Sequence, residues 1–219
     1  ITSQDSDGDT ELYDVKEFYR MRYLDTRIYL LDFQRSANQV FDGKLPVYSD
    51  DGIILGVRDK NVEYMMNDSA TVLAFVQEGD LWGYSPGNGK VNQVFSFRKT
   101  EDGDFRDSRI QHDIKIVRVT DAGDIDFVLY GYMNRGSHEG YEGIGVYHYN
   151  PDKNVAEERA FIPVSESFEF LKKDLEKLSY VNEENELFLL LAKSLYKINI
   201  EDNSSEVLEE GIKNANFVS

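Results

Sequence analysis

Short apolar strands alternate with polar turns along most of this chain. Four strands carry an aromatic residue at their second position, and each runs through a polar turn into another apolar strand. These strands are Ile28–Phe33, Leu81–Tyr84, Val146–Tyr149 and Leu195–Ile198. The tetrapeptide Asn-Gln-Val-Phe occurs twice, at 38–41 and at 92–95. Hairpins repeated in this way are typical of a β-propeller.

A second repeat lies out of phase with the first. Polar turns begin at Val57, Val119 and Val181, each 62 residues after the previous one, and each turn separates two apolar strands. Together the two repeats describe a four-stranded meander, which is one propeller blade. Between residues 53 and 97 the segment Thr71–Val76 adds a strand, so the register there can be read in two ways, one strand apart.

The pattern therefore predicts an all-β fold of propeller-like repeats, each a four-stranded antiparallel meander. The repeats form either a small closed propeller or an arc of a larger, partial one. Apolar residues at helical spacing (Phe168, Leu171, Leu175 and Leu178) predict one short helical insertion at 166–177. Residues 1–12 are polar and predict a flexible acidic tether, followed by a propeller-like domain at 13–219. Aromatic and β-branched residues at 17–33 favour strands over a helix at 15–23.

The segment Val72–Tyr84, which reads VLAFVQEGDLWGY, resembles the blades of WD40-like and TolB-like propellers. In those families an inner strand passes through a Gly or Asp turn into an aromatic strand. The resemblance extends over residues 24–212 as a pattern, and the Trp-Asp dipeptide of true WD40 repeats is missing. It implies a scaffold for binding, since most such repeats are interaction platforms, although a fold alone does not determine a function.

The charge and composition of the chain limit the classes of partner that it can bind. The chain has 41 acidic and 24 basic residues, for a net charge of -17. This acidic balance argues against binding to nucleic acid or to anionic lipid. No run of 18 apolar residues occurs, so no membrane insertion is predicted within this chain. The absence of cysteine fits an extracytoplasmic or cell-surface bacterial protein.

The glycine-rich loop at 134–143 is the strongest candidate for a binding site. Its three glycines permit unusual backbone angles, and its polar side chains supply donors, acceptors and a titratable group. If it joins the second and third strands of a blade, it lies on the face that propellers use for ligands. The alternative is an ordinary exposed hairpin loop. The predicted ligand-binding residues are Asn134, Arg135, His138, Glu139 and Tyr141.

Acidic residues near the start form a possible calcium loop. Carboxylates at alternating positions around a glycine can surround a hard cation, and here they are Asp5, Asp7, Asp9 and Asp14. Ser3 at the first loop position and Asp14 at the twelfth, where glutamate is usual, depart from that pattern. An acidic disordered tether is the alternative. No phosphate-binding, metalloprotease or nucleophile-elbow motif occurs, and no cofactor is predicted.

Three functions remain open on these grounds. The first is a non-enzymatic binding or scaffolding module, an extracytoplasmic part of a larger bacterial protein with a protein, small-molecule or carbohydrate partner. The second is a carbohydrate-active propeller enzyme, which would need two carboxylates about 5 to 10 Å apart in a deep pocket. The third is a small-ligand sensor that uses the 134–143 loop through Arg135 and His138.

Overall fold

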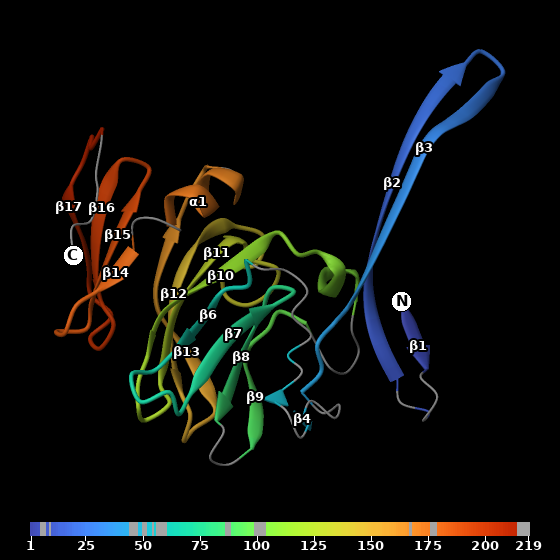
Figure 1. The fold of residues 1–219 in the computed structure, drawn as a ribbon. Coiled ribbons are helices and arrows are strands. Elements are labelled where there is room, and N and C mark those ends of the chain that lie inside the picture. The colour runs from blue at the N-terminus through green and yellow to red at the C-terminus, as the bar shows by residue number, and fades with distance from the viewer. Residues whose placement is uncertain are drawn as a thin grey trace. The chain divides into compact units, whose positions relative to one another are not determined.

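A computed structural model describes residues 1–4, 8, 10–43, 48–49, 52–53, 55, 61–85, 89–98, 104–166, 168–175 and 179–213. It confirms a mostly β fold with one short α-helix (Figure 1). The chain forms two compact units, Ile1–Arg58 and Asp59–Ser219. The sequence predicted a boundary between a tether and a domain after residue 12. The structure instead groups residues 13–58 with the N-terminal segment. A tether role for residues 1–12 stays a prediction.

The first unit is built around one long hairpin. Strands β2 (Thr10–Leu24) and β3 (Arg27–Gln39) pair antiparallel, and β1 (Thr2–Gln4) adds to the outer edge of β2. A separate two-stranded ladder joins β4 (Tyr48–Ser49) to β5 (Gly52–Ile53). The preference for strands over a helix at 15–23 is confirmed. The first aromatic strand, 28–33, lies in this three-stranded sheet and not in a four-stranded meander, so the expected repeat does not include it.

The second unit contains three four-stranded antiparallel sheets, in each of which the strands follow chain order. We call them the first, second and third blades. The first blade comprises β6 (Tyr64–Met66), β7 (Leu73–Gln77), β8 (Asp80–Ser85) and β9 (Lys90–Phe95). The second comprises β10 (His112–Val119), β11 (Ile125–Tyr132), β12 (Glu142–Asn150) and β13 (Val155–Pro163). The third comprises β14 (Ser179–Val181), β15 (Glu186–Leu191), β16 (Ser194–Asn199) and β17 (Ser205–Glu209).

Two short helices lie between the blades. The 3-10 helix η1 (Phe105–Ser108) follows the first blade, and α1 (Phe168–Leu175) lies between the second and third blades. The predicted helical insertion at 166–177 is thus confirmed, with its observed ends two residues inside the predicted ones. A meander that repeats three times, with each strand beside its chain neighbours, is the arrangement of propeller blades.

All three blades share one polar turn between their first and second strands. The side chain of the first turn residue accepts a hydrogen bond from the amide of the residue four positions later, and the residue before that amide has a positive φ. The accepting side chains are Asn67, Thr120 and Asn182, at 2.8, 3.0 and 2.8 Å from the amides of Thr71, Asp124 and Glu186. The positive-φ residues are Ala70, Gly123 and Asn185.

This shared turn resolves the register of the first blade. Its first-to-second turn is Asn67–Thr71, so Leu73–Gln77 is the second strand and Tyr64–Met66 is the first. The turn expected to begin at Val57 was therefore one strand too early, and Val57 itself lies outside the described residues. In the second and third blades the turns follow Val119 and Val181, as predicted.

The second blade is buried on both faces, which explains why β11 is largely apolar; its one buried carboxylate, Asp126, accepts from Arg118 Nε at 2.7 Å. One face of β11, including Phe127 and Leu129, packs with side chains of the first blade. The opposite face, including Val128 and Tyr130, packs with α1 and the third blade. Alternate residues of a strand point to opposite faces, so a strand covered on both sides is apolar at most positions, and a polar residue buried there needs a partner.

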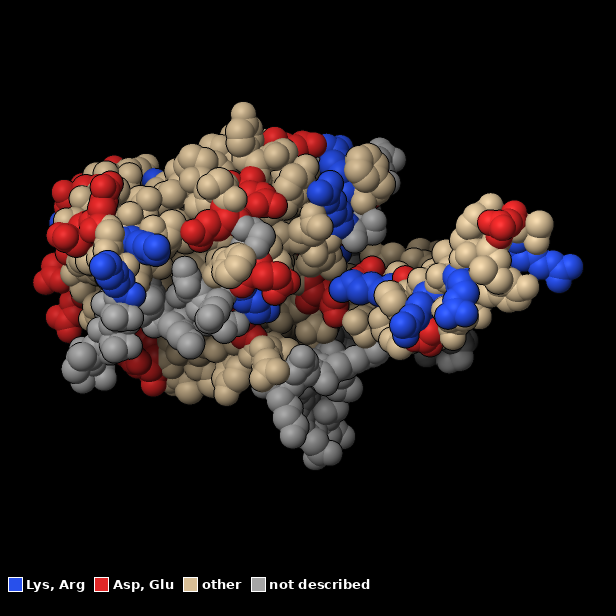
Figure 2. Space-filling model, turned by 90° about the horizontal axis from the view of Figure 1, so that it is seen from above, with Lys and Arg blue, Asp and Glu red and all other residues tan. Residues whose placement is uncertain are grey.

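Charge is distributed unevenly over the chain. Acidic side chains are spread over the visible face of the second unit (Figure 2). The second unit holds 30 acidic and 17 basic residues of the whole sequence, a net charge of -13 out of -17. Such a surface repels polyanions.

His112 at the start of β10 makes stability depend on pH. The side chain is 5% exposed, and its Nε2 lies 3.0 Å from the carbonyl oxygen of Gly79, which joins the first two blades. Its Nδ1 has no partner among the described residues. Burial lowers the pKa of His112 to about 4 from its ordinary 6.5. The neutral ring is therefore the folded form near neutral pH.

We expect the free energy of unfolding to fall as pH drops from about 6.5 towards 4. In that window the unfolded chain takes up a proton on this ring that the folded chain does not, and the full effect is about 3 kcal/mol. Urea unfolding of the wild type and of His112→Gln at a series of pH values measures it. The variant should show a shallower decline, and equal slopes for the two proteins would contradict the prediction.

Candidate functional site

The predicted loop lies where the sequence placed it, between the second and third strands of the second blade. It leaves β11 at Met133, whose amide donates to the carbonyl of Tyr141 at 2.9 Å, and the amide of Gly140 donates back to Met133 at 3.0 Å. Gly136 and Gly140 have φ values of 92° and 93°. These are left-handed angles, so glycine is needed for the loop to fold back on itself.

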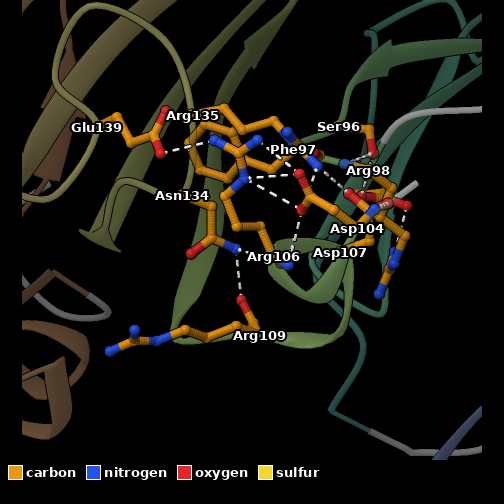
Figure 3. A network of polar contacts seen from close by, with 11 residues as sticks. Ser96, Phe97, Arg98, Asp104, Arg106, Asp107, Arg109, Asn134, Arg135 and Glu139 are labelled. Carbon is orange, nitrogen blue, oxygen red and sulfur yellow. Dashed lines mark hydrogen bonds and ion pairs between the residues drawn. The ribbon is translucent and has the colours of Figure 1, made fainter. Parts of the chain in front are cut away.

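Arg135 anchors this loop to the segment that follows the first blade (Figure 3). Its Nε donates to the carbonyl of Phe97 at 2.7 Å, and its Nη2 donates to Asp104 at 3.0 Å and to Asp107 at 2.6 Å. Asp104 is the N-cap of η1. The Arg135 side chain is only 12% exposed, so most of its donor capacity is used inside the protein.

Arg106 extends this polar network from η1 to the other side of the loop (Figure 3). Its guanidinium binds Asp104, which lowers the pKa of that carboxyl well below its usual range. Its Nη1 donates to Glu139 at 2.7 Å. The buried Asn134 amide donates to the carbonyl of Arg106 at 3.2 Å and to that of Arg109. The network thus closes the loop onto η1 from both sides.

His138 and Tyr141 point elsewhere. The His138 ring stacks on Phe161 with centroids 3.7 Å apart, and its Nε2 lies 2.8 Å from Glu158. Glu158 also accepts a hydrogen bond from the Tyr147 hydroxyl at 2.9 Å. Tyr141 is 63% exposed. Of the five predicted residues, Asn134, Arg135, His138 and Glu139 thus have protein partners, and a ligand would have to compete with those contacts. Ligand binding by this loop stays a prediction.

The predicted calcium site falls mostly outside the described residues. Asp5, Asp7 and Asp9 lie outside them, and Asp14 lies in β2, with Lys16 Nζ 3.9 Å away. Among the residues that the structure describes, no group of three or more His, Asp or Glu side chains could hold a metal ion.

A pocket that the sequence did not indicate lies at the opposite end of the blades. In a meander the connections alternate between two ends, so the first-to-second and third-to-fourth connections share one end. There a pocket of about 790 Å³ lies between the first and second blades. This volume is within the range of small-molecule sites. Its polar lining consists of Thr71, Tyr84, Ser85, Asn92, Asp121, Tyr149, Asp152 and Asn154.

We call this pocket, between the turns of the first and second blades, the turn pocket. Its side chains are polar at the rim and apolar deeper in. Val72 and Ile125, which line it, are 8% and 1% exposed. Asp121 is held in place because its Oδ1 accepts from Asn67 Nδ2 at 2.7 Å and from Ser69 Oγ at 2.8 Å. These bonds, chiefly that from Ser69, lower the pKa of Asp121 and keep it ionised. Asp121 thus presents a fixed negative charge and also ties the second blade to the first.

The lining residues set the class of ligand that the pocket can accept. Among the described residues that line the pocket there are two carboxylates, Asp121 and Asp152, and no lysine, arginine or histidine. Negative charge without a compensating cation disfavours phosphates and carboxylates as ligands. Carboxylate, amide and hydroxyl groups together can instead accept and donate hydrogen bonds to the hydroxyl or amino groups of a ligand.

Within the described residues, no helix has the length and apolar character needed to cross a lipid bilayer. No family description matches the chain, and no curated protein matches it. One similar solved structure is Porphyromonas gingivalis dipeptidyl peptidase 4, with 10% identity and a TM-score of 0.44 over 94% of this chain and 32% of that one. Another is the extracellular domain of a putative one-component system from B. thetaiotaomicron, with 12% identity and a TM-score of 0.20 over 99% of this chain and 30% of that one. The chain spans about a third of each, and both scores are too low to support a conclusion.

Proposed function

We propose that this chain is a non-enzymatic binding module that holds a small, polar, uncharged or cationic ligand in the turn pocket between its first two blades. The supporting observation is the fixed Asp121 carboxylate at the rim of a pocket of about 790 Å³. We include in this proposal a WD40-like or TolB-like blade type, supported by the strand order, and a location outside the cytoplasm, supported by the absence of cysteine.

A sugar or other polyol is the ligand that best fits this lining. Vicinal hydroxyl groups donate to carboxylates and accept from amides, and Asp152, Asn92 and Asn154 supply such groups. The half-buried ring of Tyr84 and the apolar floor offer contact for the C–H faces of a sugar ring. A protein built from rigid sheets with ligand-contacting residues on turns is a common way to hold a site in place.

Glycoside hydrolysis is the second candidate, because two carboxylates line the same pocket. A general acid in such an enzyme needs a raised pKa so that it carries a proton near neutral pH. The pKa of Asp121 is shifted in the opposite direction, by hydrogen bonds that stabilise its ionised form. Asp121 therefore does not fit the role of the general acid.

Ligand-dependent stabilisation tests the proposal. We expect at least one sugar in a panel of mono- and oligosaccharides to raise the melting temperature of the chain. Asp152→Asn should lower the affinity for that sugar about 10-fold, which is the effect of losing one charged hydrogen bond. Glu183→Gln is the control for loss of an acidic side chain, because Glu183 is an exposed acid on the first-to-second turn of the third blade and does not line the turn pocket. It should leave affinity unchanged. Sugar phosphates should not stabilise the chain.

Different results would point to the other candidates. Loss of binding in Arg135→Ala with normal binding in Asp152→Asn would assign the ligand to the 134–143 loop. Release of reducing sugar from an oligosaccharide, abolished by Asp152→Asn, would identify an enzyme. No stabilisation by any sugar, together with stabilisation by an anionic ligand, would contradict the proposed ligand class.

A further inference from the structure

The two carboxylates of the turn pocket come from two turns of the second blade. Asp121 lies in the turn between β10 and β11, and Asp152 lies in the turn between β12 and β13. Asn150 Nδ2 ties the two turns together by donating to Asp124 Oδ1 at 3.4 Å. Asp121 and Asp152 are both exposed, so a ligand in the pocket can reach them. The two negative charges therefore lie on the second-blade side of the pocket.

Neither carboxylate is neutralised by a described cation. Asp121 accepts from an amide and a hydroxyl of the first blade, which are both uncharged donors. The neighbour of Asp152 in sequence is Lys153, whose Nζ lies 4.0 Å from Glu157 on β13. Among the residues that the structure describes, no lysine, arginine or histidine forms an ion pair with either pocket carboxylate. Both charges thus remain available to a ligand.

These charges favour a ligand that carries a positive charge of its own. The second unit has a net charge of -13, and a cleft lined by one sign of charge concentrates ions of the opposite sign. Hydrogen bonds between ionised groups are also about twice as strong as those between neutral groups. An ammonium group has three donors and no acceptor, which suits a wall of carboxylate acceptors.

The rest of the lining suits the hydroxyl groups of a sugar ring. The Tyr149 hydroxyl donates to Asn154 Oδ1 at 2.8 Å, and no described residue accepts from Asn154 Nδ2. This amide can therefore donate to a ligand oxygen. Thr71 and Ser85, on the first-blade side, add hydroxyl groups that both donate and accept. The pocket thus combines a charged wall with groups that recognise neutral hydroxyls.

We infer that the ligand of the turn pocket is an amino sugar, whose ammonium group is held by Asp121 and Asp152 while its hydroxyl groups bond to the surrounding amides and hydroxyls. This inference rests on the proposed function and narrows its ligand from polar sugars in general to sugars that carry an amine. The positive charge of the ligand replaces the cation that the described lining lacks.

Sugars that differ in one group test this inference. Glucosamine and glucose differ only at carbon 2, which carries an amine in one and a hydroxyl in the other, and galactosamine and galactose form a second pair. At about pH 6 the amine is protonated and the carboxylates are ionised. We expect NMR titration of the wild type to give a dissociation constant about fivefold lower for the amino sugar of at least one pair. The N-acetylated sugars, which keep the nitrogen without its charge, should not share this preference.

Salt and pH verify that the preference is electrostatic. Raising the salt concentration from about 0.1 M to about 1 M shortens the screening length from about 10 Å to about 3 Å. Raising the pH to about 9 removes the proton of the sugar amine, which titrates near pH 8 as an α-amino group does. Each change should reduce the preference for the amino sugar to about twofold or less.

Asp121→Asn tests the role of the carboxylate. The variant keeps the size of the side chain and an oxygen that can accept from the first blade, and it should reduce the preference to about twofold. Asp68→Asn is the matched control, because Asp68 is an exposed acid on the adjacent turn of the first blade and does not line the pocket. It should leave the preference unchanged. Melting of each variant without ligand verifies that it folds.

Three results separate the inference from the proposed function. An uncharged sugar that binds at least as tightly as both amino sugars would overturn this inference alone and leave the proposed function standing. An equal loss of affinity for both members of a pair in Asp121→Asn would give Asp121 a structural role and would also overturn the inference. If no sugar of the wider panel, neutral or amino, stabilises the chain, the proposed function fails as well.

Discussion

Arg98→Ala is expected to lower the free energy of unfolding by about 3 to 5 kcal/mol, the cost of removing one partner of a buried ion pair. Its guanidinium pairs with Asp80, whose side chain is 4% exposed, and also donates to the carbonyl of Glu78 at 2.6 Å. Ser96 Oγ donates to the same carboxylate at 2.7 Å. Burial already raises the pKa of Asp80, so without Arg98 the ionised carboxylate would be strongly disfavoured.

Urea unfolding of three variants checks this expectation. Lys153→Ala removes a cation that is 68% exposed and 4.0 Å from Glu157, and it should cost less than about 0.5 kcal/mol. The double variant Asp80→Asn/Arg98→Met removes both charges and should recover part of the loss caused by Arg98→Ala. A cost for Arg98→Ala as small as that for Lys153→Ala would contradict the buried position of the pair.

The second and third blades could be predicted from the sequence because their signals are local. Thr120 and Asn182 each bond to the amide four residues later, so the whole turn lies within five consecutive residues. The first blade was placed one strand out of register, because the polar segment after Val57 has the same local pattern as the true turn at Asn67. The hairpin of β2 and β3 was taken for part of a blade because Ile28–Phe33 has the alternation of a blade strand. Only its long-range pairing distinguishes the two.

For the two candidate sites, too, the sequence predicts local features but not long-range contacts. The 134–143 loop was correctly placed between the second and third strands, but the partners of Arg135 lie 28 to 38 positions away in sequence. No local spacing predicts that the guanidinium of this arginine donates its hydrogen bonds to other residues of the protein. The turn pocket combines residues from five segments between Ala70 and Asn154. Each segment reads as an ordinary polar turn or strand end, and only the stacking of two blades brings them together.

Gly131→Ala is expected to be about as damaging as loss of the buried ion pair, at about 4 kcal/mol. Gly131 lies in β11 opposite His112 with a φ of 114°, and it is one of the few positions where a glycine is required. A side chain there would meet the carbonyl oxygen of Gln111 and would lie 2.9 Å from His112 Cα and 3.0 Å from Phe168. Backbone strain costs about 1 to 3 kcal/mol, and overpacking costs a similar amount.

Gly140→Ala separates these two contributions. Gly140 has a φ of 93°, but no atom lies within 4 Å of the position that its Cβ would take. It should therefore cost only the strain, about 1 to 2 kcal/mol, in the same urea experiment. Equal losses in the two variants would show that contact at Gly131 contributes nothing. A larger loss at Gly131 would mean that close approach between β11, the chain before β10 and α1 stabilises the second unit, and that this approach holds the second blade beside both of its neighbours.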